Sequence, residues 1–359
     1  MVGPLPVKIN ELIKIIQPKV DVQVRIREKT VYASDGRHGI AWTGKHGIKD
    51  GDYVKFNEGC LTIGSVPGRQ WDVPKSRLIR VIVSSLGREH LEAIVEAATW
   101  SKRFVPDGDN VSNRVIFEIA PGRFAITGTD GRRMAKRNFA GKIKVVPQKP
   151  GKDKDEKVFI DTLTAMVSID KRDGSPNFIS MLKYMFGQLG PQSLNLIIYE
   201  DRVVFQAECS CGTVDYWAPA HVTYELMAPL LFSEERAMRT FRLKNLKDLV
   251  DAHDKAGATV KICFDGKTGK VFMGADEWGK GPAHEFPVCK VEALGPKTCR
   301  LSDFNPLYVV MRVTTDRPNT VIAFNARYLK YVTDMFKDNI IMHTDGTVAI
   351  FEPGVQKWF

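Results

Sequence analysis

Apolar residues recur at helical spacing in several short segments of the chain. Between residues 7 and 17, Ile9, Leu12, Ile13 and Ile16 follow the i, i+3, i+4, i+7 spacing that places apolar side chains on one face of a helix. Polar residues fill most positions between them, so the segment predicts an amphipathic helix with one buried face. The same spacing predicts further helices over residues 88–101, 177–188, 245–255 and 325–337.

Strand-like sequence follows each of these helices. Its runs are rich in β-branched and aromatic residues, and Asp-Gly, Pro-Gly and similar pairs that favour tight turns interrupt them. The recurring unit is therefore a helix followed by antiparallel strands, which predicts an α+β fold class. The predicted strands are residues 20–26, 30–33, 53–56, 60–64, 114–120, 123–129, 194–199, 202–208, 259–264, 270–274, 340–343 and 347–351.

A short motif repeats within this pattern. Residues 124–135 (FAITGTDGRRMA) and residues 30–41 (TVYASDGRHGIA) both run from a strand-like segment into Ser/Thr-Asp-Gly-Arg and then a basic residue. Residues 270–279 (KVFMGADEWG) form a weaker copy that keeps Ala-Asp and loses Gly-Arg. Repeats spread over a long chain favour one fold element used several times. Asp130, which precedes the turn glycine, is expected to hydrogen-bond the backbone of its own turn.

Length and charge narrow the class of protein. The 359 residues allow two or three domains. No apolar run approaches the ~18 residues of a membrane span, and residues 1–17 lack the pattern of a signal peptide, so we expect a cytoplasmic protein. The net charge of +10 favours polyanionic partners, usually nucleic acid. The mixed-charge segment 147–157 indicates a solvated loop between two units rather than a nucleic-acid-binding arm.

The sequence contains no arrangement typical of catalysis or metal binding. Its seven histidines are isolated, and no Gly-x-x-x-x-Gly-Lys-Ser/Thr phosphate loop occurs. Of the six cysteines, only Cys209 and Cys211 lie close in sequence. The alternating run 202–212 predicts that both point to one face of a strand, half-buried or buried, rather than acting as metal ligands. We therefore predict a protein that is not an enzyme, with no catalytic residue, metal or cofactor.

Two segments resemble a known family. Residues 113–135, which end in TDGRRMA, and residues 322–330 (IAFNARYLK) are similar to two motifs of the bacterial beta sliding clamps, the processivity subunits of DNA polymerase III. A looser likeness covers residues 53–65. The resemblance implies a DNA clamp fold and a head-to-tail homodimeric ring around double-stranded DNA, acting as a processivity factor in DNA replication. It also implies three similar domains per chain, at residues 1–85 (shortened), 86–222 and 238–359.

The chain departs from that family in three respects. Its first domain is short, its net charge is basic where family members are usually acidic, and residues 351–359 (FEPGVQKWF) lack the usual Met-Pro-Met-like terminal strand. These departures favour a divergent clamp encoded by a phage or mobile element. They also keep an alternative open, a clamp-fold protein that binds nucleic acid or a polymerase as a regulator or inhibitor without forming a ring. For a protein that does form a ring, a trimer is the alternative to the homodimer.

The resemblance implies a peptide-binding pocket at the second copy of the motif. In the family, the matching segment accepts short linear peptides from DNA polymerases, clamp loaders and other partners. Gly131 would permit the turn, Met134 would supply apolar contact, and Arg132 and Arg133 would rim the pocket together with Thr129. A strand-turn-strand unit with a solvated basic tip explains the same local sequence, so both interpretations stay open.

Basic residues on or beside the predicted helices form the second candidate site. They lie off the apolar stripes, so as a set they could line a channel that contacts DNA phosphates without reading sequence. For any single lysine, a solvated helix face is the simpler explanation. The predicted channel residues are Lys14, Arg88, Lys102, Arg103, Lys183, Lys244, Lys247, Lys255, Arg327 and Lys330.

Overall fold

The chain was analysed as a computed structural model. The residues that the structure describes are 5–16, 23–27, 30–34, 37–45, 53–57, 60–64, 79–101, 113–120, 122–131, 133–140, 142–145, 163–169, 178–223, 235–252, 259–265, 268–274, 283–285, 289–300, 307–312, 321–337 and 339–354.

All five predicted helices are present, with ends that differ from the predicted ones by a few residues at most. Their buried positions follow the predicted stripes; in α1, for example, Ile9, Leu12, Ile13 and Ile16 have no exposed surface, whereas Lys14 is exposed. Among the helices that the structure describes, none is long and apolar enough to cross a membrane. The helices are α1 (Val7–Ile16), α2 (Arg88–Ser101), α3 (Phe178–Gly187), α4 (Leu246–Ala252) and α5 (Ala326–Phe336).

The chain divides into two compact units. Unit 1 comprises residues 1–106, 111–128 and 139–227, and unit 2 comprises residues 107–110, 129–138 and 228–359. The strands of unit 1 are β1 (Gln23–Arg27), β2 (Thr30–Ser34), β3 (Gly39–Thr43), β4 (Tyr53–Asn57), β5 (Cys60–Gly64), β6 (Ile79–Ser84), β7 (Arg114–Ala120), β8 (Arg123–Thr129), β10 (Lys142–Val145), β11 (Leu163–Ser168), β12 (Ser193–Tyr199), β13 (Arg202–Cys209) and β14 (Gly212–Thr223).

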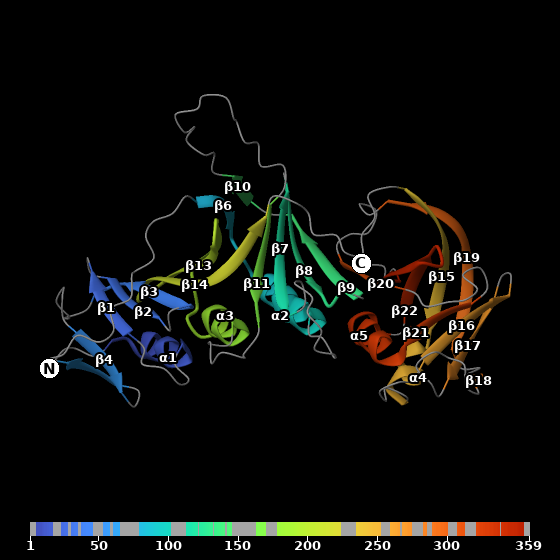
Figure 1. Cartoon of the computed structure of the whole chain (residues 1–359), viewed down its shortest axis with the longest axis horizontal. Coiled ribbons are helices and arrows are strands. Elements are labelled where there is room, and N and C mark those ends of the chain that lie inside the picture. Colours follow the sequence, from blue (N-terminus) through green and yellow to red (C-terminus); the bar gives the residue numbers. More distant parts are fainter. Residues whose placement is uncertain are drawn as a thin grey trace, which may run out of the picture. The chain divides into compact units, whose positions relative to one another are not determined.

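Unit 1 is built around an extended antiparallel sheet. Its strands pair in the order β5–β4–β1–β2–β3–β14–β13–β12–β6–β10. Residues 213–217 of β14 pair with β3, and residues 220–223 pair with β11, which continues to β7 and β8. The helices α1, α3 and α2 lie along the strands (Figure 1), and α3 contacts both of the others. Gly128 is required where β8 meets α2, because a Cβ atom there would lie 2.0 Å from the carbonyl oxygen of Ala97.

Unit 2 is a second antiparallel sheet with two helices. Its strands pair in the order β9–β20–β23–β22–β15–β19–β17–β16–β21, and β18 pairs with β17. Helix α5 packs on β21, β22 and β23 and contacts α4. The strands are β9 (Arg133–Phe139), β15 (Arg236–Lys244), β16 (Thr259–Asp265), β17 (Thr268–Gly274), β18 (Ala283–Glu285), β19 (Lys290–Cys299), β20 (Leu307–Arg312), β21 (Val321–Asn325), β22 (Asn339–Thr344) and β23 (Val348–Pro353).

Two strand pairings far apart in the sequence follow the same pattern. Strand β3, which follows the first copy of the repeated motif, pairs with β14, and β9, which follows the second copy, pairs with β20. Strand β14 thereby lies between β3 and β13, and β20 lies between β9 and β23. The order along the chain differs, because β14 directly follows its neighbour β13, whereas β20 precedes its neighbour β23. Equivalent places in the two sheets are thus filled from different points of the sequence.

The prediction for the cysteine pair is wrong in one respect. Strand β13 ends at Cys209, and Ser210 and Cys211 form the turn into β14, so the two cysteines do not share a face of one strand. Both side chains are half-buried, as predicted. Burial raises the pKa of the Cys209 thiol to about 11, and the neighbouring Cys211 adds to this effect. Within the described residues, no group of three His, Cys, Asp or Glu side chains could hold a metal ion.

Candidate functional site

The second copy of the repeated motif forms a tightly hydrogen-bonded turn between β8 and β9. The Thr129 hydroxyl donates to the carbonyl oxygen of Arg133 at 2.7 Å and accepts from the amide of Gly131 at 3.0 Å. One carboxylate oxygen of Asp130 accepts from the amide of Arg133 at 3.0 Å. Gly131 has φ +83°, a conformation that glycine adopts without strain. The prediction that Asp130 bonds its own turn is confirmed.

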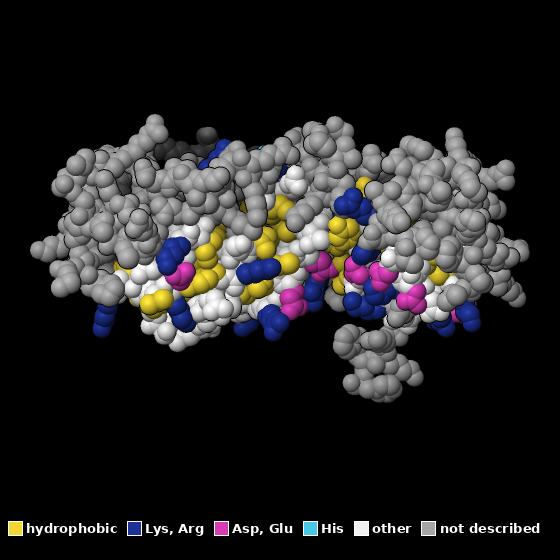
Figure 2. Space-filling view, turned by 90° about the horizontal axis from the view of Figure 1, so that it is seen from below, with side chains coloured by type: hydrophobic (Ala, Val, Ile, Leu, Met, Phe, Trp, Pro, Cys, Tyr) yellow, Lys and Arg dark blue, Asp and Glu magenta, His cyan; other side chains and the backbone are white. Residues whose placement is uncertain are grey.

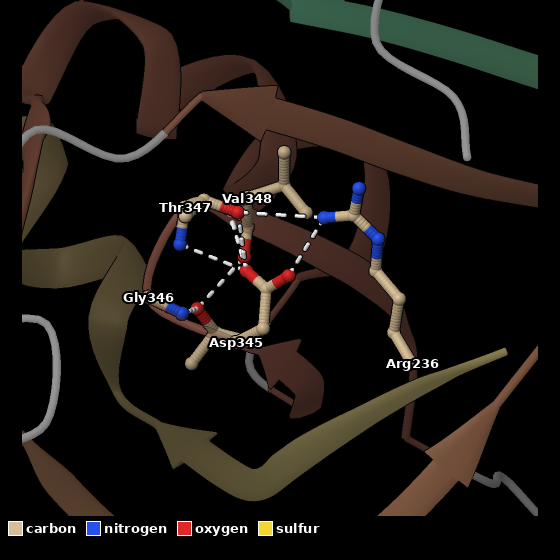
Figure 3. A network of polar contacts seen from close by, with 6 residues as sticks. Arg236, Asp345, Gly346, Thr347 and Val348 are labelled. Atoms are coloured by element: carbon tan, nitrogen blue, oxygen red, sulfur yellow. Dashed lines mark hydrogen bonds and ion pairs between the residues drawn. The ribbon is translucent and has the colours of Figure 1, made fainter. Parts of the chain in front are cut away.

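The same turn recurs at residues 344–348, between β22 and β23 (Figure 3). The Thr344 hydroxyl donates to the carbonyl oxygen of Val348 at 2.7 Å and accepts from the amide of Gly346 at 3.0 Å, and Asp345 accepts from the amide of Val348 at 3.0 Å. The prediction for this segment is only an Asp-Gly turn, although its Thr-Asp-Gly matches the second copy. The weaker copy proposed at residues 270–279 lies partly outside the described residues.

The first copy of the motif retains the characteristic side-chain bond. The Ser34 hydroxyl donates to the carbonyl oxygen of His38 at 2.7 Å, the bond that Thr129 makes in the second copy. The His38 side chain is buried, and its Nδ1 lies 2.8 Å from the hydroxyl of Tyr216 on β14. His38, which directly precedes β3, therefore binds β14, the strand with which β3 pairs.

In the second and third turns, the other carboxylate oxygen binds an arginine. Asp130 accepts from Nε of Arg133 at 3.0 Å, and both side chains are enclosed. Asp345 accepts from Nη1 of Arg236, which comes from β15, at 2.8 Å (Figure 3). Burial alone would raise the pKa of Asp345, but hydrogen bonds from Val348, Thr347 and Arg236 outweigh burial, and the pKa lies below its usual value.

Arg133 also connects β9 with α5. Its guanidinium carbon lies 4.8 Å from the ring centre of Tyr328 and 4.2 Å from that of Tyr331, within the range of cation–π attraction. The sequence motif does not identify the two tyrosines as partners of the turn. Their spacing of three residues on a helix was visible, but nothing in the sequence links them to a residue almost two hundred positions away.

The residues of the predicted peptide pocket have very different surroundings. Thr129, Arg133 and Met134 have no exposed surface, Gly131 is half-buried, and Arg132 lies outside the described residues. Arg133 therefore does not rim an open pocket in this conformation, and Met134 contacts the chain's own interior. The pocket itself stays a prediction. The apolar cluster around Met134 consists of Met238, Cys299, Tyr308, Val310 and Ile350.

The predicted channel residues differ in position and in pairing. Lys14 binds Glu11 at 2.6 Å, and Arg88 binds Glu92 at 3.1 Å. Lys247 binds Asp251 on its own helix at 2.5 Å and Asp334 of α5 at 3.4 Å.

The other predicted channel residues differ in exposure and position. Lys183 and Arg327 are exposed on α3 and α5, and Lys330 is half-buried. Lys244 ends strand β15 rather than lying on a helix, and Lys102, Arg103 and Lys255 lie outside the described residues.

The described helices carry no net charge. Together they contain seven Lys or Arg and seven Asp or Glu residues. Figure 2 shows this mixture, with Lys and Arg side chains lying among Asp, Glu and apolar ones. The described strands, by contrast, contain 21 basic and seven acidic residues. The described helices as whole segments are therefore neutral, and the channel lined by basic helix faces stays a prediction.

The fold is that of the bacterial sliding clamps. The chain superposes on the beta subunit of the Streptococcus pyogenes DNA polymerase (TM-score 0.51, 11% identity, covering 99% of this chain and 100% of that one). It also superposes on a putative DNA polymerase III beta subunit from Eubacterium rectale (TM-score 0.57, 11% identity, covering 99% of each chain). A third match is the Helicobacter pylori beta clamp bound to a DNA ligase peptide (0.55, 8%, 99% and 100%).

These matches confirm the fold that the sequence motifs implied. No protein-family model and no curated protein matches the sequence. The likeness to DNA polymerase III beta subunits thus lies in the three-dimensional arrangement of the whole chain, with about one residue in ten identical.

The lowered pKa of Asp345 predicts a pH-dependent contribution to stability. A carboxyl group whose pKa is lower in the folded than in the unfolded chain stabilises the fold above the unfolded pKa, about 3.9, and loses this effect as the pH falls further. We expect Asp345→Asn to lower the free energy of unfolding by about 2 kcal/mol at neutral pH. In urea unfolding, the difference from the parent chain should shrink below about pH 4. A difference independent of pH, or an equal effect of Asp248→Asn at an exposed position, would contradict this role.

The enclosed pair of Asp130 and Arg133 predicts strong coupling between the two side chains. Arg133→Met leaves a buried carboxylate without its cation, so it should lower the free energy of unfolding by about 3–5 kcal/mol. The double variant Asp130→Asn/Arg133→Met should cost less than Arg133→Met alone. Urea unfolding of the two single variants and the double variant measures the coupling energy, with exposed Arg123→Met as the control. Strictly additive effects would show that the pair does not interact.

Proposed function

We propose that this protein is a DNA sliding clamp, a non-enzymatic processivity factor that encircles duplex DNA and tethers a DNA polymerase in the cytoplasm. The observation that carries the proposal is the clamp fold over 99% of the chain and over the full length of clamps such as that of Streptococcus pyogenes. A likeness confined to one domain would allow many functions, whereas the likeness here extends over the entire chain, which supports a function that uses the whole fold.

The two equivalent ladders support a ring. With domains at residues 1–85, 86–222 and 238–359, the ladder of β3 and β14 joins the first domain to the second, and that of β9 and β20 joins the second to the third. Both joints use the strand that leaves a Ser/Thr-Asp-Gly turn. A head-to-tail contact between two chains would repeat this joint, and such contacts produce closed rings when the rotation closes.

The partners follow from the same proposal. The Helicobacter pylori clamp binds a DNA ligase peptide, and we infer that this chain binds linear peptides of a DNA polymerase and a clamp loader. Gly131 and Arg132 at the turn would contact such a peptide. Thr129, Arg133 and Met134, which are enclosed, would support the turn from the interior.

The helices would face DNA in the ring with little net charge. Exposed Lys14, Arg88, Lys183 and Arg327 could contact phosphates, while the acidic residues beside them keep the attraction weak. Weak, sequence-independent contact suits a ring that slides. The absence of net charge on the described helices also favours a second candidate function, a clamp-fold regulator or inhibitor that binds a polymerase or nucleic acid without encircling DNA.

The mass of the particle in solution separates the two functions. A clamp ring of three-domain chains should behave as a homodimer with twice the chain mass of 40.3 kDa. Size-exclusion chromatography with light scattering over a dilution series measures this mass. A species that remains monomeric at micromolar concentration would favour the regulator, and a trimer would require a ring of different construction.

A further inference from the structure

The ladder of β15 and β19 in unit 2 is one of the most basic parts of the chain. Residues 235–244 and 289–300, which contain β15 and β19, include seven basic and two acidic residues. Their net charge of +5 is half of the +10 of the whole chain. The basic residues are Arg236, Arg239, Arg242, Lys244, Lys290, Lys297 and Arg300.

Two lysines face each other at one end of this ladder. Lys244 and Lys290 are directly opposite in the antiparallel register, so their side chains lie on the same face of the sheet. Both are exposed, and within the described part of the chain neither has an acidic partner. The next pair on this face is Arg242 and Glu292, whose side chains are 3.1 Å apart. Like charges directly opposite are unfavourable, so this sheet face retains a repulsion that a bound anion would remove.

We propose that this face of the β15–β19 ladder binds the phosphate backbone of duplex DNA, outside the channel of the proposed ring. Lys244 and Lys290 would contact two adjacent phosphates at one end, and exposed Lys297 would contact the same strand further along. Lys297 lies seven positions after Lys290 along β19, or roughly 20 Å away. Each DNA strand carries one charge per ~3.4 Å along the axis, so several phosphates would lie within this length.

The side chains of the ladder favour a duplex over a single strand. Binding of single strands depends on aromatic side chains on which bases stack. Phe241 is the one aromatic residue of β15 and β19, and it is buried. A duplex keeps its bases stacked internally and offers only its backbone to a flat basic surface, so the expected binding is independent of sequence.

The inference does not depend on closure of a ring. A short linear duplex can occupy the ladder of a monomer or a dimer, and the helices take no part in the contact. If the chain forms a clamp ring as well, the ladder provides a place for DNA outside the ring. If the ladder does not bind DNA, the particle mass measured by light scattering is unaffected. If the protein is monomeric, the ladder is still present and can still bind DNA.

Removal of the two lysines tests the inference. The probe is a fluorescein-labelled linear duplex of about 24 base pairs, and fluorescence anisotropy is measured over a sodium chloride series. We expect Lys244→Ala/Lys290→Ala to weaken binding about tenfold at low salt and to reduce the slope of log K against log salt by about 1.8, or 0.9 per lost phosphate contact. The matched control is Lys142→Ala/Lys144→Ala, which removes two exposed lysines from β10 and changes net charge equally.

The outcomes distinguish a specific surface from overall charge. Lys244→Arg/Lys290→Arg should retain binding, and the alanine pair should keep or raise the midpoint of thermal unfolding because it removes a repulsion. Equal losses in the ladder and β10 variants would overturn the proposal in favour of net charge alone. Unchanged DNA binding of the ladder variant, with loss of binding to a labelled polyglutamate, would overturn it in favour of an acidic protein partner.

Discussion

The carboxylate of an aspartate in a Thr-Asp-Gly turn fixes the direction in which the chain leaves that turn. In the turn at residues 129–133, one oxygen of Asp130 holds the amide of Arg133 and the other holds its guanidinium. Strand β9 begins at Arg133 and pairs with β20, so this bond network determines the start of the strand that enters the next part of the sheet. Ser34 and His38 occupy the same position ahead of β3. These two ladders therefore combine a short polar network at the turn with apolar packing, as between Met134 of β9 and Tyr308 of β20.

Charged residues are distributed unevenly between the described strands and the described helices. The described strands carry the excess of positive charge, and the described helices carry none. Lys247 shows the physical reason, because it lies between Asp251 and Asp334, whose negative charges offset its own. A clamp of this kind would hold DNA by closure of the ring rather than by attraction, and basic strands would be available for contacts elsewhere. Fold and surface charge are independent properties here, so function cannot be inferred from net charge alone.

Local sequence patterns predicted the helices and the turn. The surroundings of the candidate site residues depend on contacts between segments that are far apart in the sequence. Helical periodicity placed all five helices, and Asp before Gly correctly indicated a turn bonded by Asp130. The burial of Arg133 was not visible, because its aromatic partners Tyr328 and Tyr331 come from the far end of the chain. The place of β20 was also hidden, since its neighbour β23 comes later in the chain, whereas β13, the corresponding neighbour of β14, comes before it. The pairing of Arg88 with Glu92, four residues apart, could have been read from the sequence.

Electron microscopy of the purified protein tests the central claim most directly, because a sliding clamp must enclose a hole. Class averages should show a closed ring with a central opening that accommodates duplex DNA, built from two copies of the chain. An arc or a solid particle of one chain, at concentrations where light scattering finds no larger species, would contradict the clamp function while leaving the fold unchanged.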